Sequence, residues 1–163
     1  MLKFIAENAN NKNIQILHIT GERFFEKFVK QLRDMGIDNT DKNIKVVPYF
    51  YEMPKALNIA DLTITSGGAI TIAELTAVGL PSIIVPKGYT AENHQEYNAK
   101  ALDDKGASVM IKEKDLTYEV LSKTIYEILN DRPRLEEMSK NSKAIGIKDA
   151  DKKIVNLVEE IIK

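Results

Sequence analysis

The sequence predicts an α/β fold in which a doubly wound, Rossmann-like parallel sheet is followed by an all-helical C-terminal tail. Short β-branched runs alternate with stretches of helical spacing up to residue 111, and only helical patterns follow. This alternation is typical of parallel sheets, because each parallel connection needs a crossover that a helix supplies. The 163 residues are enough for one domain with a hydrophobic core.

Five apolar runs bounded by Gly, Pro, Asn or Asp are predicted to be strands. They are residues 14–19, 44–47, 62–65, 82–85 and 108–111. A helix is predicted over residues 2–9, before the first strand, and Gly79 with Pro81 beyond it predicts the end of a central helix. Asp131-Arg132-Pro133 predicts the start of another helix within the tail, residues 118–163.

The composition excludes several classes of function. The formal net charge of −1 gives no basic field, so we expect no nucleic-acid partner. The chain has no cysteine, which excludes disulfides, thiolate nucleophiles and sulfur metal ligands. The two histidines, His18 and His94, lie far apart and have no neighbouring acidic ligand pattern, so we expect no dedicated metal site. Apolar runs are too short for a membrane span or a signal peptide, and we expect a cytoplasmic protein.

The strongest functional signal is the segment from Thr63 to Glu74, which reads TITSGGAITIAE. An apolar run enters the turn Ser66-Gly67-Gly68, and a helical pattern begins directly after it. The first N–H groups of a helix have no partner within the helix, and they form a ready site for phosphate. Two glycines let the backbone approach an anion closely. Glu74 is well placed to accept hydrogen bonds from sugar hydroxyls, so the segment indicates a nucleotide sugar.

A purely structural alternative stays open for this segment. Gly-Gly turns join strands to helices in many α/β proteins as plain connectors, and a glutamate on the following helix is common. The segment lacks the third glycine of G-x-G-x-x-G and the Gly-Lys-Ser/Thr of a Walker A loop. It therefore matches neither of these two phosphate-binding motifs.

Further motifs follow in a fixed order along the chain. They are His18-x-Thr20-Gly21, Tyr49-Phe50-Tyr51-Glu52-Met53, the Ser66–Glu74 segment, Gly79-Leu80-Pro81-Ser82-Ile83-Ile84-Val85-Pro86 and Asn93-His94-Gln95-x-x-Asn98-Ala99. Together they resemble the C-terminal half of the MurG family, the family 28 glycosyltransferases that transfer N-acetylglucosamine from UDP-N-acetylglucosamine to lipid I in peptidoglycan synthesis. The resemblance covers residues 2–162 and implies one half of a two-domain glycosyltransferase B architecture, the half that holds the donor.

The resemblance also implies roles for individual residues. The backbone of Phe50 would meet the uracil edge, and Met53 would pack near the base and the diphosphate. Glu74 would bind the ribose hydroxyls, while His94 and Gln95 would hold hydroxyls of the sugar. The residues that face the diphosphate would be Gly67, Gly68, Ala69, Ile70 and Thr71. No cofactor is implied, because UDP-N-acetylglucosamine is a substrate and loop amides would stabilise the departing UDP.

For the whole protein, the resemblance sets further expectations. We expect residues 1–163 to form a single nucleotide-sugar-binding domain that lacks its first strand and first Gly-rich loop, with the N-terminal acceptor domain absent. That domain would supply the lipid I site, the general base and the membrane-association surface. The chain alone is therefore expected to have no turnover and contains no assigned catalytic residue. The full-length enzyme, an inverting hexosyltransferase, would act as a peripheral protein at the cytoplasmic face of the cell membrane.

Two alternatives to this function stay open. One is the binding subunit of a split glycosyltransferase, which would complete its site with a partner chain. The other is a related nucleotide-sugar enzyme, either another glycosyltransferase or an epimerase, since these share a glycine-rich helix start and a carboxylate for the ribose.

The apolar stripes of the helical tail predict packing into the core. The last helix, around residues 154–162, is an exception, because in the resembled architecture it usually crosses to the other domain. Its stripe would then be partly unburied, which favours self-association of this chain.

Overall fold

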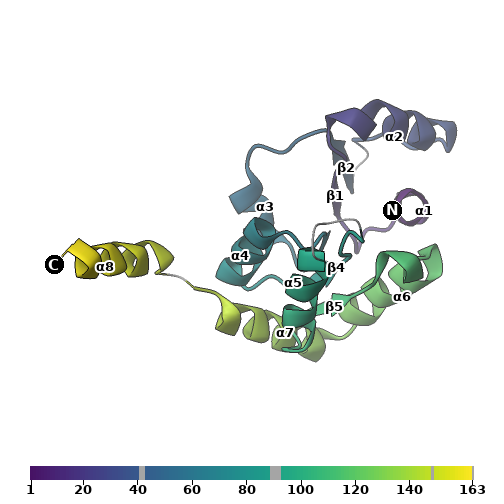
Figure 1. Ribbon diagram of the computed structural model, residues 1–163. Coiled ribbons are helices and arrows are strands. Elements are labelled where there is room, and N and C mark those ends of the chain that lie inside the picture. Colours follow the sequence, from purple (N-terminus) through teal and green to yellow (C-terminus); the bar gives the residue numbers. More distant parts are fainter. Residues whose placement is uncertain (41–42, 89–92, 148, 163) are drawn as a thin grey trace. The chain divides into compact units, whose positions relative to one another are not determined.

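The computed structural model describes residues 1–40, 43–88, 93–147 and 149–162. The chain divides into two compact units, Met1–Pro54 and Lys55–Lys163. Figure 1 shows their strands and helices in chain order. Parallel strands alternate with helices, which confirms the predicted fold class.

The described residues of the first unit form two strands and two helices. Its elements are α1 (Leu2–Glu7), β1 (Ile16–Ile19), α2 (Glu22–Asp34) and β2 (Ile44–Val47). The two strands pair in parallel, so that Ile16 lies opposite Ile44 and Ile19 opposite Val47. The sequence predicted β2 to the residue and placed the start of β1 two residues too early.

A small hydrophobic core holds the first unit together. Its most deeply buried apolar side chains are Phe4, Ile5, Val29, Leu32, Ile44 and Val46. The α2 helix contributes only part of its apolar residues to this core, because Phe24 is 56% exposed, and Met35, which caps the end of the helix, is 50% exposed. Asn43 fixes the chain before β2: its side-chain amide donates to the carbonyl oxygens of Asn8 at 2.7 Å and Ile14 at 2.9 Å.

In the second unit, three parallel strands form a sheet in the order β3-β4-β5. The strands are β3 (Thr63–Thr65), β4 (Ser82–Ile84) and β5 (Ser108–Met110), and their first residues lie in one register row. All residues of β4 are buried, as expected for a central strand covered on both faces. Ile84 packs in a core cluster with Ala99, Leu102 and Ala107.

The remaining elements of the described chain are helical. They are α3 (Met53–Ile59), which begins at the end of the first unit, then α4 (Ala69–Val78), α5 (His94–Asp103), the short 3₁₀ helix η2 (Glu113–Asp115), α6 (Tyr118–Leu129), α7 (Arg132–Ile145) and α8 (Ala150–Ile162). The tail after β5 is therefore helical, as predicted.

Local signals end and begin these helices where the sequence predicts. Gly79 adopts a left-handed conformation with φ of 76°, and its N–H donates to the carbonyl oxygen of Leu75 at 2.8 Å. At the start of α7, the carboxylate of Asp131 accepts a hydrogen bond from the N–H of Arg134 at 3.0 Å, with proline in the first turn.

Helices α6 and α7 pack into the second unit, but α8 does not. α6 and α7 bury Leu121, Ile125, Ile128, Leu135 and Met138. No residue of α8 is buried, and the side chains of its apolar stripe are 48–77% exposed. Core packing is thus confirmed for α6 and α7, and the stripe of α8 is unburied, as expected for the last helix. None of the described helices is both long and apolar enough to cross a membrane.

Candidate functional site

Two loops of the candidate site follow strands of the second unit's sheet. Ser66–Gly68 come directly after β3, and Lys87 and Gly88 come shortly after β4, before α5. In a parallel sheet the carboxyl ends of the strands lie along one edge, where α/β proteins bind ligands. The structure thereby brings the start of α4 and the start of α5 together at this edge.

The amino-terminal end of α4 has the features of an anion site. Gly68 is the N-cap residue, with φ of −68° and ψ of 136°, and no side chain caps this end of the helix. Ala69 and Ile70 follow it with exposed side chains, and Thr71 is partly buried. Since the first backbone N–H groups of a helix point outward along its axis, this end can donate several hydrogen bonds to a phosphate.

Glu74 lies on α4 in the turn that follows Thr71, and it is exposed. No acidic residue occupies the first turn of α4, so the carboxylate of Glu74 does not compete with an anion at the helix end. A carboxylate in this position can accept two hydrogen bonds from a diol.

Gly67 is held against α5 by close packing of the two backbones. It is buried, and a Cβ atom added to it would overlap the backbone carbonyl oxygen of Gln95. Asn98 strengthens this contact, because its side-chain amide donates to the carbonyl oxygen of Gly67 at 3.0 Å. Gly68 has room for a Cβ, whose nearest neighbour would be the hydroxyl of Thr71 at 3.8 Å. Close packing therefore requires glycine at position 67 and does not require it at position 68.

The predicted sugar-binding pair lies in the first turn of α5. His94 is exposed and Gln95 is partly buried. The side-chain oxygen of Gln95 accepts a hydrogen bond from the backbone N–H of Lys87 at 3.1 Å. An N–H group can only donate, so this contact fixes which end of the Gln95 amide faces Lys87.

Two further residues, which the sequence did not single out, support the same region. Glu113 accepts a hydrogen bond from the N–H of Gly88 at 3.1 Å. Lys112 forms an ion pair with Glu96 in the first turn of α5, and this pairing raises the pKa of the Lys112 ammonium. No motif points to these contacts in the sequence, because they join residues 16 and 25 positions apart.

Phe50 and Met53 belong to the first unit. The family resemblance implies that these two residues contact the uracil base. Phe50 follows β2 and is partly buried, and the ammonium group of Lys45 lies 5.6 Å from the centroid of its ring. Met53 is the first residue of α3 and is also partly buried. Both residues thus come after the carboxyl end of β2.

His18 is partly buried in β1 of the first unit, with its ring centroid 4.6 Å from that of Phe28. Burial lowers the pKa of its imidazole, and the positive charge of the N-terminus lowers it further. His18 is therefore neutral at pH 7 and packs against an aromatic ring. Within the described ranges, no cluster of three or more His, Cys, Asp or Glu side chains is arranged to hold a metal ion.

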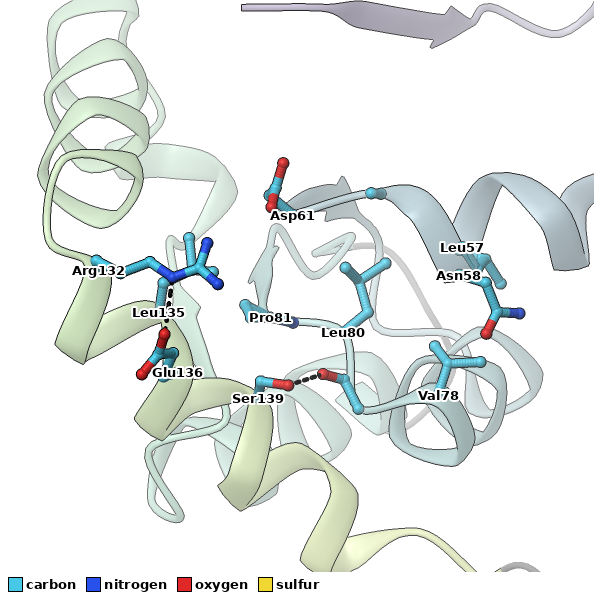
Figure 2. A pocket seen from close by; sticks show the side chains of 12 residues that line it. Leu57, Asn58, Asp61, Val78, Leu80, Pro81, Arg132, Leu135, Glu136 and Ser139 are labelled. Carbon is cyan, nitrogen blue, oxygen red and sulfur yellow. Dashed lines mark hydrogen bonds and ion pairs between the residues drawn. The ribbon is translucent and has the colours of Figure 1, made fainter.

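A cavity of about 300 Å³ lies at the opposite edge of this sheet, near the amino ends of β3 and β4 (Figure 2). Asp61 and Pro81 line it just before these strands, and α7 contributes Arg132 and Glu136, which form an ion pair at 2.8 Å. None of the predicted site residues lines this cavity. It is therefore separate from the edge that carries the glycine turn.

Comparison with a protein-family model gives a match over residues 2–154 to the "Glycosyltransferase family 28 C-terminal domain". Similar curated relatives carry the name UDP-N-acetylglucosamine--N-acetylmuramyl-(pentapeptide) pyrophosphoryl-undecaprenol N-acetylglucosamine transferase. The relative from Desulforamulus reducens is 42% identical over 99% of this chain and 44% of its own length. The relative from Clostridioides difficile (strain 630) is 43% identical over 99% of this chain and 38% of its own length.

Solved structures of glycosyltransferases are also similar to this chain. The crystal structure of Acinetobacter baumannii MurG superposes with a TM-score of 0.78 at 28% identity, over 97% of this chain and 46% of that chain. The glycosyltransferase VinC in complex with dTDP superposes with a TM-score of 0.66 at 18% identity, over 98% of this chain and 38% of that chain, a likeness of fold alone. The chain thus spans less than half the length of the relatives it matches.

Proposed function

This chain belongs to the glycosyltransferase family 28 C-terminal domain family, and on that premise we propose that it binds the sugar donor of a hexosyltransferase, UDP-N-acetylglucosamine. The relatives are named for transfer of N-acetylglucosamine to N-acetylmuramyl-(pentapeptide) pyrophosphoryl-undecaprenol, which is lipid I. We propose the same reaction, in peptidoglycan synthesis, for the whole protein of which this chain supplies the donor side.

The observation that carries the proposal is the uncapped helix end at Gly68–Thr71, which lies beside Gly67 and the first turn of α5. The backbone N–H groups at this end would donate to the diphosphate of the donor. Because they are fixed by the helix, they need no reorganisation when the leaving diphosphate gains negative charge. The α4 dipole adds a favourable field at the same place.

In this proposal, the other site residues bind the ribose and the sugar of the donor. Glu74, one turn further along α4, accepts hydrogen bonds from the ribose hydroxyls. His94 and Gln95 meet the sugar from α5. The roles of Phe50 and Met53, which belong to the first unit, at the uracil base stay a prediction of the family resemblance. The assignments of Glu74, His94 and Gln95 match hydroxyl groups of the ligand with side chains of complementary hydrogen-bonding type.

In the proposed reaction, a hydroxyl oxygen of lipid I attacks the anomeric carbon of N-acetylglucosamine. The new C–O bond forms as the bond from that carbon to the diphosphate breaks, the configuration inverts, and UDP leaves with the bonding electron pair. The acceptor site and the base that takes the hydroxyl proton belong, in this proposal, to the part of the protein outside this sequence. Turnover then requires that part, at the cytoplasmic face of the membrane.

Calorimetric titration of the chain with UDP and with UDP-N-acetylglucosamine tests the donor assignment. We expect both to bind and the sugar nucleotide to bind more tightly. In a His94→Ala, Gln95→Ala double variant, the affinity for UDP-N-acetylglucosamine should fall about tenfold toward that of UDP, since two hydrogen bonds to the sugar are lost. Equal affinities of the unaltered chain for the two ligands would contradict a sugar-binding role for this pair.

The exposed stripe of α8 supports a second proposal, that this chain self-associates. The stripe consists of Ile154, Val155, Leu157, Val158, Ile161 and Ile162. Sedimentation velocity should show a mass that rises with concentration, and Ile154→Lys with Ile161→Lys should abolish the rise, because burying ammonium groups is costly. Asn156→Lys, on the polar face of the same helix, is the matched control. A monomer at every concentration would refute self-association.

A further inference from the structure

Three non-covalent contacts close a ring of residues around Gln95. The side-chain oxygen of Gln95 accepts from the N–H of Lys87, and the N–H of the next residue, Gly88, donates to Glu113. Lys112, the neighbour of Glu113, pairs with Glu96, the neighbour of Gln95. These three contacts and the peptide bonds between the three pairs of neighbouring residues form a closed ring that begins and ends at Gln95.

This ring fixes the orientation of the Gln95 side chain. Its amide oxygen is turned toward the Lys87 N–H, so the NH₂ group forms the other end of the amide and can only donate. The backbone of Gln95 is fixed as well, because its carbonyl oxygen packs against the buried Gly67. A side chain held at both its backbone and its tip loses little rotamer entropy when a ligand binds.

Two charged side chains of the ring come from one short segment. Lys112 and Glu113 lie where the chain leaves β5 and enters η2. Lys112 pairs with Glu96 in the first turn of α5, and Glu113 accepts a hydrogen bond from the backbone of Gly88, which follows β4. The two contacts thus tie together the two segments that meet at Gln95, and no other role in the donor site has been assigned to either residue.

We propose that Lys112 and Glu113 are positioning residues that hold Gln95 as a hydrogen-bond donor to the sugar of the nucleotide-sugar ligand. This role rests on the proposed function of the site. Neither residue touches the ligand; both act through Gln95. Their contribution is therefore to the preference for a sugar nucleotide over the free nucleoside diphosphate, and not to the affinity for the diphosphate itself.

The test compares affinities of the full chain for UDP and UDP-N-acetylglucosamine by calorimetry. In Lys112→Met and in Glu113→Ala we expect the preference for the sugar nucleotide to fall about fivefold, with the affinity for UDP within twofold of the unaltered chain. Lys112→Arg keeps the charge and Glu113→Gln keeps an acceptor oxygen, so both should retain most of the preference. Glu136→Gln, which breaks the ion pair with Arg132 at the other edge of the sheet, is the matched control and should change neither affinity.

Amide exchange measured by NMR without ligand gives an independent readout. The N–H groups of Lys87 and Gly88 should exchange slowly in the unaltered chain and several times faster in Glu113→Ala. An unchanged preference for the sugar nucleotide in both Lys112→Met and Glu113→Ala would overturn the positioning role while leaving the donor site intact. Failure of the unaltered chain to bind either ligand would overturn the proposed function and this role together, with the exchange rates still showing whether the ring exists.

Discussion

Replacement of Glu74 with alanine is expected to weaken the binding of UDP-N-acetylglucosamine and of UDP by a factor of at least about ten. In the proposed site its carboxylate accepts two hydrogen bonds from the ribose, and hydrogen bonds to a charged group contribute about 1.5–3 kcal/mol each after exchange with water. Both ligands carry the ribose, so both should lose affinity equally. Calorimetric titration of the variant beside the unaltered chain measures this loss.

Two controls separate ligand contact from damage to the fold. Glu74→Gln keeps one acceptor oxygen and should show an intermediate loss. Because Glu74 is exposed, we expect the free energy of unfolding of both variants to lie within about 0.5 kcal/mol of that of the unaltered chain. Thermal melts measure this difference. Unchanged affinity for UDP in Glu74→Ala would exclude the ribose contact, whereas a large fall in stability would point to a structural role.

The second large effect is expected on stability, from Gly67→Ala. The added methyl group would overlap the backbone carbonyl oxygen of Gln95, and a backbone cannot yield as the end of a flexible side chain can. Overpacking of this kind costs about 1–3 kcal/mol. The variant should therefore unfold several degrees below the unaltered chain in a thermal melt, and α5 should be displaced from the glycine turn.

Gly68→Ala is the matched control for this prediction. Its Cβ would have open space, with the Thr71 hydroxyl 3.8 Å away, and its φ of −68° suits any residue. We expect a free energy of unfolding within about 0.5 kcal/mol of the unaltered chain, because alanine is a poorer N-cap residue than glycine but lowers the entropy of the unfolded chain. If the two alanine variants unfolded at the same temperature, the close approach of Gly67 to α5 would be refuted.

Much of the fold could be predicted from the sequence, because its signals are local. Strand β2 was predicted to the residue, and the other four strands lie within the predicted runs. The end of α4 at Gly79 follows from the left-handed conformation that glycine adopts readily. The exposure of the α8 stripe was expected from the family resemblance and not from periodicity, because periodicity reports an apolar stripe but not what lies against it.

The candidate site could be predicted only in part, for the same physical reason. Residues of one segment, such as Gly68 and Glu74, have their relation set by the geometry of a single helix. Lys112 and Glu113 take part through long-range contacts with Glu96 and Gly88, and no periodicity or local motif records such contacts.

The sequence by itself determined the parallel α/β class, the order of elements and the helix start that follows Ser66-Gly67-Gly68. These depend on hydrophobic period, on β-branching and on backbone preferences of glycine and proline, which act over a few residues. Only the tertiary structure decided that Gly67 packs against the Gln95 backbone and that a ring of contacts orients the Gln95 amide. Those relations arise when the carboxyl ends of separate parallel strands are brought to one edge, so they depend on the folded chain and not on its local patterns.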